Sequence, residues 1–234
     1  MSTTPWAMIE AEVYDRLNNL ASTSIAMADT AYRTIPKTDA EVGDEAFPKT
    51  AIREAIVDVV MEVISFLCQT EGDPRRQQYR QTANVAHLGS MPSAMGPYGS
   101  ITFDGRPMVP RPASIVAQRA DNPGGIYQVD VYFYAIDGNT LFATQSPCVV
   151  EYFKADRPAT TYAALDALFD NIGDIAPIPD EFAVNVADGA AGRLAMKAGS
   201  YIEAAQAYLT AYYQALASRG LKVAMPDYPA MPSA

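Results

Sequence analysis

The strongest pattern in the chain is a run of apolar residues at helical spacing between residues 51 and 68. Apolar side chains recur there every three or four residues, while the charged residues of the run fall mainly on the opposite face. This spacing predicts an amphipathic helix whose apolar stripe belongs to a core. The stripe consists of Ile52, Ile56, Val59, Val60, Val63, Ile64 and Leu67.

Four shorter patterns predict further helices. Near the N-terminus, Thr4 is placed to cap a helix, and Pro5 suits its first position because a missing N–H costs nothing there. A short amphipathic helix is expected over residues 161–169. Two helices should follow over residues 180–195, with a small-residue face suited to close packing, and over residues 201–219.

The middle of the chain has a different pattern. Glycine and proline are frequent between residues 89 and 125, and helical periodicity disappears there. Alternating residues and Asp-Gly turns then predict a small group of strands, including a hairpin that turns at Asp137-Gly138-Asn139. The expected strands are Gly99–Gly105, Tyr127–Ile136, Thr140–Thr144 and Val149–Phe153.

These patterns predict an α+β fold that is mainly α, a helical bundle with a small inserted antiparallel β unit and an extended C-terminal tail. The acidic segment from Asp39 to Glu45 is expected to be a solvated loop. The predicted regions are an N-terminal helical region (residues 1–84), a β insertion (85–158), C-terminal helices that complete the bundle (159–221) and a tail (222–234).

Composition excludes several classes of protein. Apolar residues make up 49% of the 234 residues, enough to build a core, so a wholly disordered chain is not expected. The most apolar stretch, Ala51 to Leu67, contains four charged residues, so no membrane-spanning helix is expected. The first residues lack a basic region before an apolar run, and no signal peptide is expected.

Residues for catalysis or metal binding are scarce. The chain has one histidine, His87, and two cysteines, Cys68 and Cys148, which are 80 residues apart and are expected to be reduced thiols. A zinc site normally needs four Cys or His ligands, and no nucleophile or phosphate-binding motif occurs. We therefore expect no enzyme, no cofactor and no metal, although a pair of adjacent carboxylates would leave no signature.

The order of these elements resembles the head-to-tail adaptor, or connector, proteins of tailed bacteriophages. Local patterns similar to those of the family are Phe47-Pro48 with Ala51–Ile56, Val85–Gly89 with Met91-Pro92, Gly96, Gly99 and Asp104-Gly105, Ile178–Phe182 with Asp188–Ala191, and Tyr208, Tyr212 and Tyr213. Together they span roughly residues 47–219. The resemblance implies a non-enzymatic virion protein of the neck, made in the host cytoplasm.

The resemblance also implies the partners. Adaptors form a ring, usually of twelve copies, between the portal protein and the tail tube or nozzle protein, and genomic DNA passes through the ring without specific binding. No membrane partner is implied. Two alternatives remain: a tail-tube or nozzle-proximal component, and a ligand- or carbohydrate-binding module that uses the tyrosine-rich β unit.

Charge gives this resemblance a physical basis. The chain has 27 acidic and 17 basic residues, a formal charge of −10. An acidic lumen would let DNA slide past, because lysine and arginine contacts to phosphates would hold it. General solubility is the alternative explanation of the same charge. Arg75, Arg76 and Arg80 form a cationic cluster that either docks on an acidic portal surface or lies in a solvated loop.

The tail is the last predicted site. Its three prolines exclude a helix or a central strand. Met225, Tyr228 and Met231 recur every three residues, which matches one face of a polyproline-II helix. We interpret the tail as an assembly arm that contacts the portal or a ring neighbour; a frayed terminus is the alternative.

Overall fold

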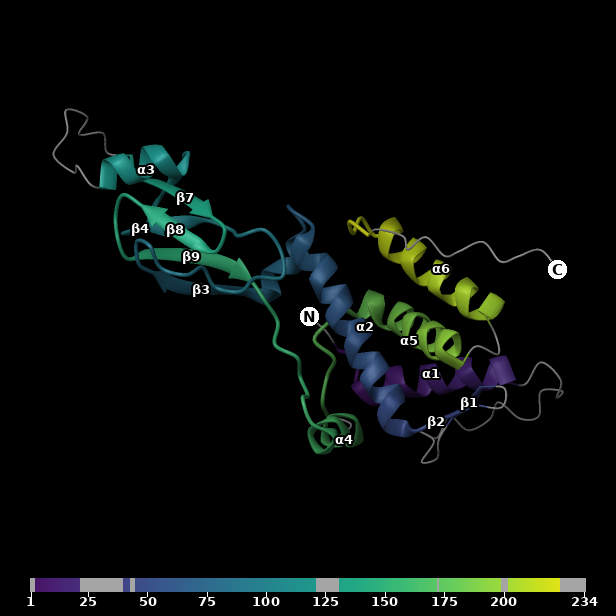
Figure 1. The fold of residues 1–234 in the computed structure, drawn as a ribbon. Helices are drawn as coiled ribbons and strands as arrows, with labels where there is room; N and C mark the ends of the chain where they lie inside the picture. The colour runs from purple at the N-terminus through teal and green to yellow at the C-terminus, as the bar shows by residue number, and fades with distance from the viewer. Residues whose placement is uncertain are drawn as a thin grey trace. The chain divides into compact units, whose positions relative to one another are not determined.

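The structure is a computed structural model that describes residues 3–21, 40–42, 45–120, 131–171, 173–198 and 202–223. Its fold is α+β and mainly α, as the sequence predicts. The chain divides into two compact units (Figure 1). One, called here the helical unit, comprises Met1–Leu67 and Asp156–Ala234, and the other, the β unit, comprises Cys68–Ala155.

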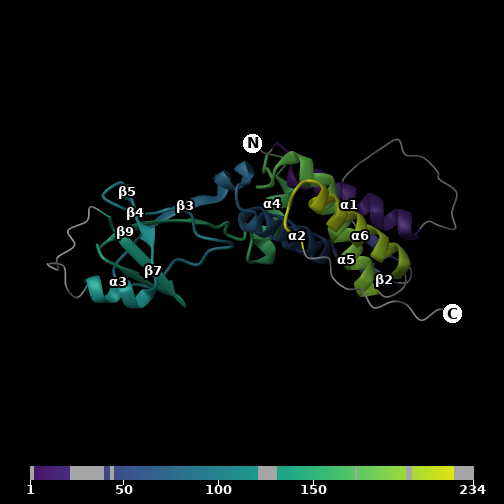
Figure 2. The same cartoon turned by 90° about the horizontal axis from the view of Figure 1, so that it is seen from above.

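The described residues of the helical unit form α-helices, a 3₁₀ turn and a short strand pair. In this unit α5 packs against both α1 and α6 and lies between them in Figure 1; Figure 2 shows the same helices from above. The elements are α1 (Trp6–Ala21), β1 (Ala40–Val42), β2 (Glu45–Phe47), α2 (Lys49–Gln69), α4 (Tyr162–Asp170), the 3₁₀ turn η2 (Asp180–Phe182), α5 (Ala183–Ala198) and α6 (Ile202–Ser218). The last two residues of α2 already belong to the β unit.

The predicted apolar stripe of α2 is confirmed as core, since all seven of its residues are fully buried. The small residues of α5 explain how the helices approach one another. A Cβ added to Gly189 would lie 3.0 Å from Val59 on α2, and one added to Gly192 would lie 2.8 Å from Leu209 on α6. Glu62 of α2 accepts hydrogen bonds from Arg193 of α5 and Tyr212 of α6, which joins the same three helices.

The N-terminus of α1 is held differently from the prediction. Thr4 does not cap α1 with its hydroxyl; the Thr4 hydroxyl donates to Asp180, which also accepts the backbone N–H groups of Thr3 and Thr4 at 2.6 and 2.9 Å. The first helical N–H, that of Trp6, donates to the carbonyl of Asp174. A distant segment supplies these acceptors, and sequence-local capping rules therefore missed them.

The β unit has three layers. The antiparallel sheet β3-β9-β4-β5 faces the sheet β6-β7-β8 across a core that includes Ile101, Leu141 and Val150, and α3 covers the second sheet through Val116 and Phe133 (Figure 1). Its elements are the 3₁₀ turn η1 (Pro74–Tyr79), β3 (Arg80–Val85), β4 (Ile101–Phe103), β5 (Arg106–Pro107), β6 (Val109–Pro110), α3 (Ala113–Ala120), β7 (Phe133–Asp137), β8 (Thr140–Ala143) and β9 (Cys148–Phe153). One pair, β6 with β7, is parallel.

Both predicted Asp-Gly turns are confirmed. Asp104 and Gly105 join β4 to β5 with φ angles of 48° and 72°, as a type I′ turn requires. Gly138, with a φ angle of 59°, lies in the turn between β7 and β8. The strand expected to begin at Tyr127 starts at Phe133 instead; residues 127–130 lie outside the described residues.

The acidic segment, one helix and the start of the β unit differ from the prediction. The acidic segment expected to be a loop contains β1 and β2, which pair with each other from Ala40–Phe47 to Val42–Glu45. Helix α3 lies where no helix was expected, because it buries one residue, Val116, and so has little periodic signal. The β unit begins at Cys68 rather than at residue 85, since β3 pairs along its whole length with β9.

Two further predictions concern the membrane and the tail. Among the helices that the structure describes, none is long and apolar enough to cross a membrane. The tail prediction falls on residues 222–234, of which 224–234 lie outside the described residues.

Candidate functional site

The three arginines of the predicted cationic cluster have separate surroundings. Arg75 forms a two-pronged ion pair with Asp73, whose side chain is 5% exposed, and these hydrogen bonds hold the pKa of Asp73 below its ordinary value. Arg76 lies 4.2 Å above the ring of Phe153. Arg80 is half exposed and faces Glu151 at 3.5 Å.

The structure therefore does not unite Arg75, Arg76 and Arg80 in one solvent-facing patch. Two of them serve contacts inside the β unit, and Arg80 is the most exposed. Their partner-binding role stays a prediction. The other three predicted site residues, Met225, Tyr228 and Met231, lie outside the described residues.

The chain's net charge is confined to one unit. The β unit contains seven acidic and seven basic residues, so its formal charge is zero. The helical unit contains twenty acidic and ten basic residues and carries the entire charge of −10. The sequence alone could have shown this partition if the unit boundaries had been known.

A buried arginine of the helical unit forms ion pairs with three of the acidic residues of that unit. Arg53 of α2 is 1% exposed and forms ion pairs with Glu10 of α1, itself fully buried, and with Asp166 and Asp170 of α4. The hydrogen bond from Arg53 holds the pKa of Asp170 below its ordinary value. The Arg53 guanidinium also lies 5.2 Å from the centre of the Phe169 ring. This network joins three helices and is structural.

Next to this network lies a cleft of about 410 Å³, called here the α2–α4 cleft. Its lining residues come from α2, from α4 and from the segment that leads into α4. They are Glu54, Arg157, Ala159, Thr160, Thr161, Tyr162 and Leu165.

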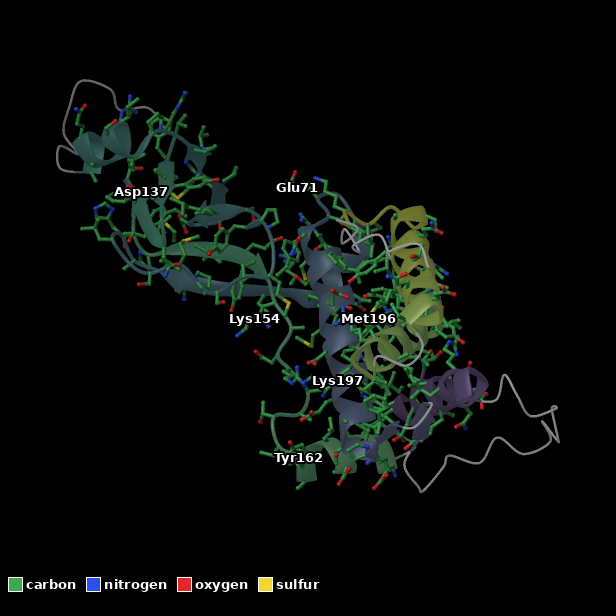
Figure 3. The ribbon with its side chains drawn as sticks, turned by 45° about the vertical axis from the view of Figure 1, so that its right-hand side comes forward. Glu71, Asp137, Lys154, Tyr162, Met196 and Lys197 are labelled. Carbon is green, nitrogen blue, oxygen red and sulfur yellow. The ribbon has the colours of Figure 1, made fainter. Side chains whose placement is uncertain are left out.

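The local sequence explains how the cleft is formed. The hydroxyl of Thr161 accepts the N–H of Ala164 and so begins α4, which places Tyr162 in its first turn (Figure 3). Tyr162 is 65% exposed, the largest exposure among the large apolar side chains that the structure describes. The guanidinium of Arg157 is held by Asp58 and by the carbonyl of Ala159.

The carboxylate of Glu54 is the unpaired charge of the cleft. Glu54 is exposed, and within the described residues its side chain has no ion pair or hydrogen bond. A carboxylate, a fixed guanidinium and an exposed aromatic ring suit the recognition of a segment that carries both a cation and an anion. They supply no nucleophile with an adjacent base.

Sequence analysis missed this cleft. Glu54 was grouped with the solvent face of its helix, and Tyr162 was one of fourteen tyrosines. One signal could have indicated the cleft. Tyr162 is a large aromatic residue directly after the cap of a short amphipathic helix, at a position that the apolar stripe of that helix does not include.

The histidine and the two cysteines of the β unit have structural contacts. His87 accepts the N–H of Ala143 through Nδ1, and its ring meets Phe142 edge-on at 6.2 Å. Both cysteines are buried unpaired thiols, as predicted, and burial raises the pKa of Cys68 to about 11. In the described ranges, no group of three His, Cys, Asp or Glu side chains is placed to hold a metal ion.

A second set of arginines lies elsewhere in the β unit. The guanidiniums of Arg111 and Arg119 lie 5.6 and 4.6 Å from the centre of one ring, that of Phe133. Arg106 is exposed beside the turn between β4 and β5, and its side chain has no partner among the residues that the structure describes.

Sequence comparison adds no assignment to this site. No family model and no curated protein matches the chain. Its function has to be argued from the architecture, the charge distribution and the cleft.

Proposed function

We propose that this protein is a head-to-tail adaptor of a tailed bacteriophage neck, a ring that joins the portal to the tail and contributes to the DNA channel. In this proposal the protein is not an enzyme. Its partners are further copies of itself, the portal protein and the tail tube or nozzle protein, and it belongs to the virion after synthesis in the host cytoplasm.

The partition of charge is the observation that carries the proposal. All ten excess negative charges belong to the helical unit, while the β unit is neutral. A ring of about twelve helical units would carry on the order of −120 charges. Such a surface repels the phosphate backbone, so DNA passes without being held.

Contacts between distant segments of the helical unit support the same function. Segments far apart in the sequence are joined by the Arg53 network, by Glu62 with Arg193 and Tyr212, and by Asp180 with Thr3 and Thr4. A ring that transmits force between capsid and tail requires subunits that keep their shape, and these contacts fix the crossings of α1, α2, α4, α5 and α6.

The carbohydrate-binding alternative receives less support. A sugar-binding module needs exposed aromatic rings, yet no described tyrosine of the β unit is fully exposed. Tyr98 donates to the carbonyl of Pro92 and Tyr152 donates to Gln81, while Tyr132 and Tyr134 pack against the core. No observation favours a tail-tube or nozzle-proximal component over an adaptor.

A pull-down with the portal protein of the same phage tests the proposal. The full chain should bind the portal, and deletion of residues 222–234 should abolish binding while leaving the helical unit folded. Lys222→Ser, which keeps Met225, Tyr228 and Met231, is the matched control and should bind normally. Failure of the full chain to bind refutes the adaptor function; normal binding by the truncated chain refutes the assembly arm alone.

A further inference from the structure

The turn between β4 and β5 presents two opposite charges on a rigid support. Asp104 and Arg106 flank Gly105, both are exposed, and neither side chain has a hydrogen bond or an ion pair within the described residues. The hairpin is fixed by the pairing of Phe103 with Arg106 and by the ring of Phe103, which meets Tyr132 at 5.3 Å. We call Asp104-Gly105-Arg106 the hairpin tip.

The two charges of the hairpin tip are complementary to two charges that line the α2–α4 cleft. Arg106 would meet the carboxylate of Glu54 and the face of Tyr162, two groups that attract a guanidinium. Asp104 would meet Arg157, which lines the same cleft. The guanidinium of Arg157 is held in place there by Asp58 and by the carbonyl of Ala159. All four of these charged residues are exposed. Because the hairpin tip supplies the cation of one pair and the anion of the other, only one orientation of the tip satisfies both pairs.

Other arginines of the β unit fit this role less well. Arg111 and Arg119 are engaged with Phe133, Arg75 with Asp73, Arg76 with Phe153, and Arg80 with Glu151. Arg106 is exposed, has no partner among the described residues and lies at the end of a two-residue turn, a feature narrow enough to enter a cleft.

We propose that the hairpin tip of one copy docks in the α2–α4 cleft of a second copy of this chain. This contact uses two different surfaces, so it is heterologous and each copy offers both a donor and an acceptor. Heterologous contacts build rings when the rotation closes. The inference deepens the proposed function and rests on it, because the ring is what requires such a contact.

Charge reversal tests the pairing in the whole chain. Glu54→Arg and Arg106→Glu should each weaken self-association, measured by sedimentation velocity over a range of protein concentrations at low salt, by about tenfold or more. An equimolar mixture of the two variants should restore association, because each interface then again joins opposite charges. Glu203→Arg, an equal charge change at an exposed position of α6, should have no such effect.

A hairpin peptide tests the cleft independently of ring assembly. A cyclised peptide with the sequence of residues 101–107 should shift the NMR amide signals of α4 in the wild-type chain and leave those of Glu54→Arg unchanged. A peptide that shifts no cleft signal overturns the proposal. The proposal is also overturned if the peptide binds the cleft but the chain stays monomeric at every concentration, because the hairpin tip then does not bind a second copy.

The outcomes separate this inference from the proposed function. Self-association that responds to Glu54 and Arg106, in a chain that does not bind the portal, supports the docking and refutes the adaptor. Portal binding together with self-association that ignores both substitutions refutes the docking and leaves the adaptor standing.

Discussion

The two units of this protein use charge in opposite ways. In the helical unit, ion pairs join segments far apart in the sequence: Arg53 reaches Glu10, Asp166 and Asp170, which lie on two other helices. In the β unit, Arg75 pairs with Asp73 two residues away. Arg80 faces Glu151, which is distant in the sequence, but the backbone pairing of β3 with β9 already brings these two strands together. In the helical unit, ion pairs hold helices together. In the β unit, they add to a geometry that strand pairing already sets.

The difference follows from how each unit satisfies its backbone. Strands bond to neighbouring strands, so the ladders of β3, β9 and β4 already set the geometry of the β unit. Helices satisfy most of their own backbone groups and are positioned mainly by side-chain contacts. The helical unit therefore depends on specific contacts, which here are close glycine packing and buried ion pairs.

Removal of Arg53 should produce the largest difference between the units. Arg53→Met leaves Glu10 buried without its cation, so we expect a loss of about 3–5 kcal/mol in the free energy of unfolding. Trp6 is the single tryptophan and packs against Phe169 at 5.3 Å, so its fluorescence reports on the helical unit during urea unfolding.

The matched control for Arg53 is Arg80→Met in the β unit, which removes a half-exposed ion pair. Its effect on the free energy of unfolding, followed by far-UV circular dichroism because Trp6 does not report on the β unit, should be at most about 1 kcal/mol. The double variant Arg53→Met with Glu10→Leu should recover most of the loss, because no buried charge is then left unpaired. Equal effects of Arg53→Met and Arg80→Met would remove the contrast between the units.

Glycine substitutions should give a smaller contrast. A Cβ at position 192 would lie 2.8 Å from Leu209 and 3.1 Å from the carbonyl of Ala205, so Gly192→Ala should cost about 1–3 kcal/mol through forced separation of α5 and α6. Gly138→Ala meets open space, and the positive φ angle there should cost about 1 kcal/mol. Thermal unfolding of both variants measures the two costs; a neutral Gly192→Ala would show that the helices can separate freely.

Lowering the pH should produce the smallest effect on stability, and this effect should develop gradually. Hydrogen bonds from Thr3 and Thr4 lower the pKa of Asp180, and those from Arg53 lower the pKa of Asp170. A lowered carboxyl pKa stabilises the fold at pH values above the ordinary value of 3.8, and this stabilisation is lost as the pH falls through the lowered pKa. The melting temperature should stay level down to about pH 5 and then decline.

Asp180→Asn isolates one component of this acid dependence. The variant should be less stable than the wild type at neutral pH and should approach it only as the pH falls through the lowered pKa of Asp180, where the wild-type carboxyl is also protonated. A constant difference between the two melting curves at all pH values would contradict the assignment to Asp180.

Sequence patterns were most reliable where the signal was local. The α2 stripe, the short helix expected over residues 161–169, the small-residue face of α5 and the Asp104-Gly105 turn all depend on neighbours within a few residues, and all are present. They were enough to predict a mainly helical α+β fold with an inserted β unit.

The errors have different causes. The segment from Ala40 to Phe47 forms a local strand pair despite its acidic composition, and α3 buries a single residue and so has little periodic signal. Strand β3 pairs with a strand about seventy residues later, which no local pattern indicates. Long-range contact also hid the cleft. Glu54 and Tyr162 lie more than a hundred residues apart, and each has an ordinary local pattern.

The sequence by itself determined five of the described helices, those with a clear amphipathic or small-residue face, where the Asp-Gly turns fall, and that the chain has few residues suited to metal or nucleophilic chemistry, because these properties depend on local spacing and composition. Tertiary structure alone decided which charges are neutralised and which remain available. Arg53 and Glu54 are adjacent in the sequence, yet one is buried among three carboxylates and the other faces a cleft. The helical twist turns neighbouring side chains to different faces, and only the packing of α1 and α4 against α2 gives each face its surroundings.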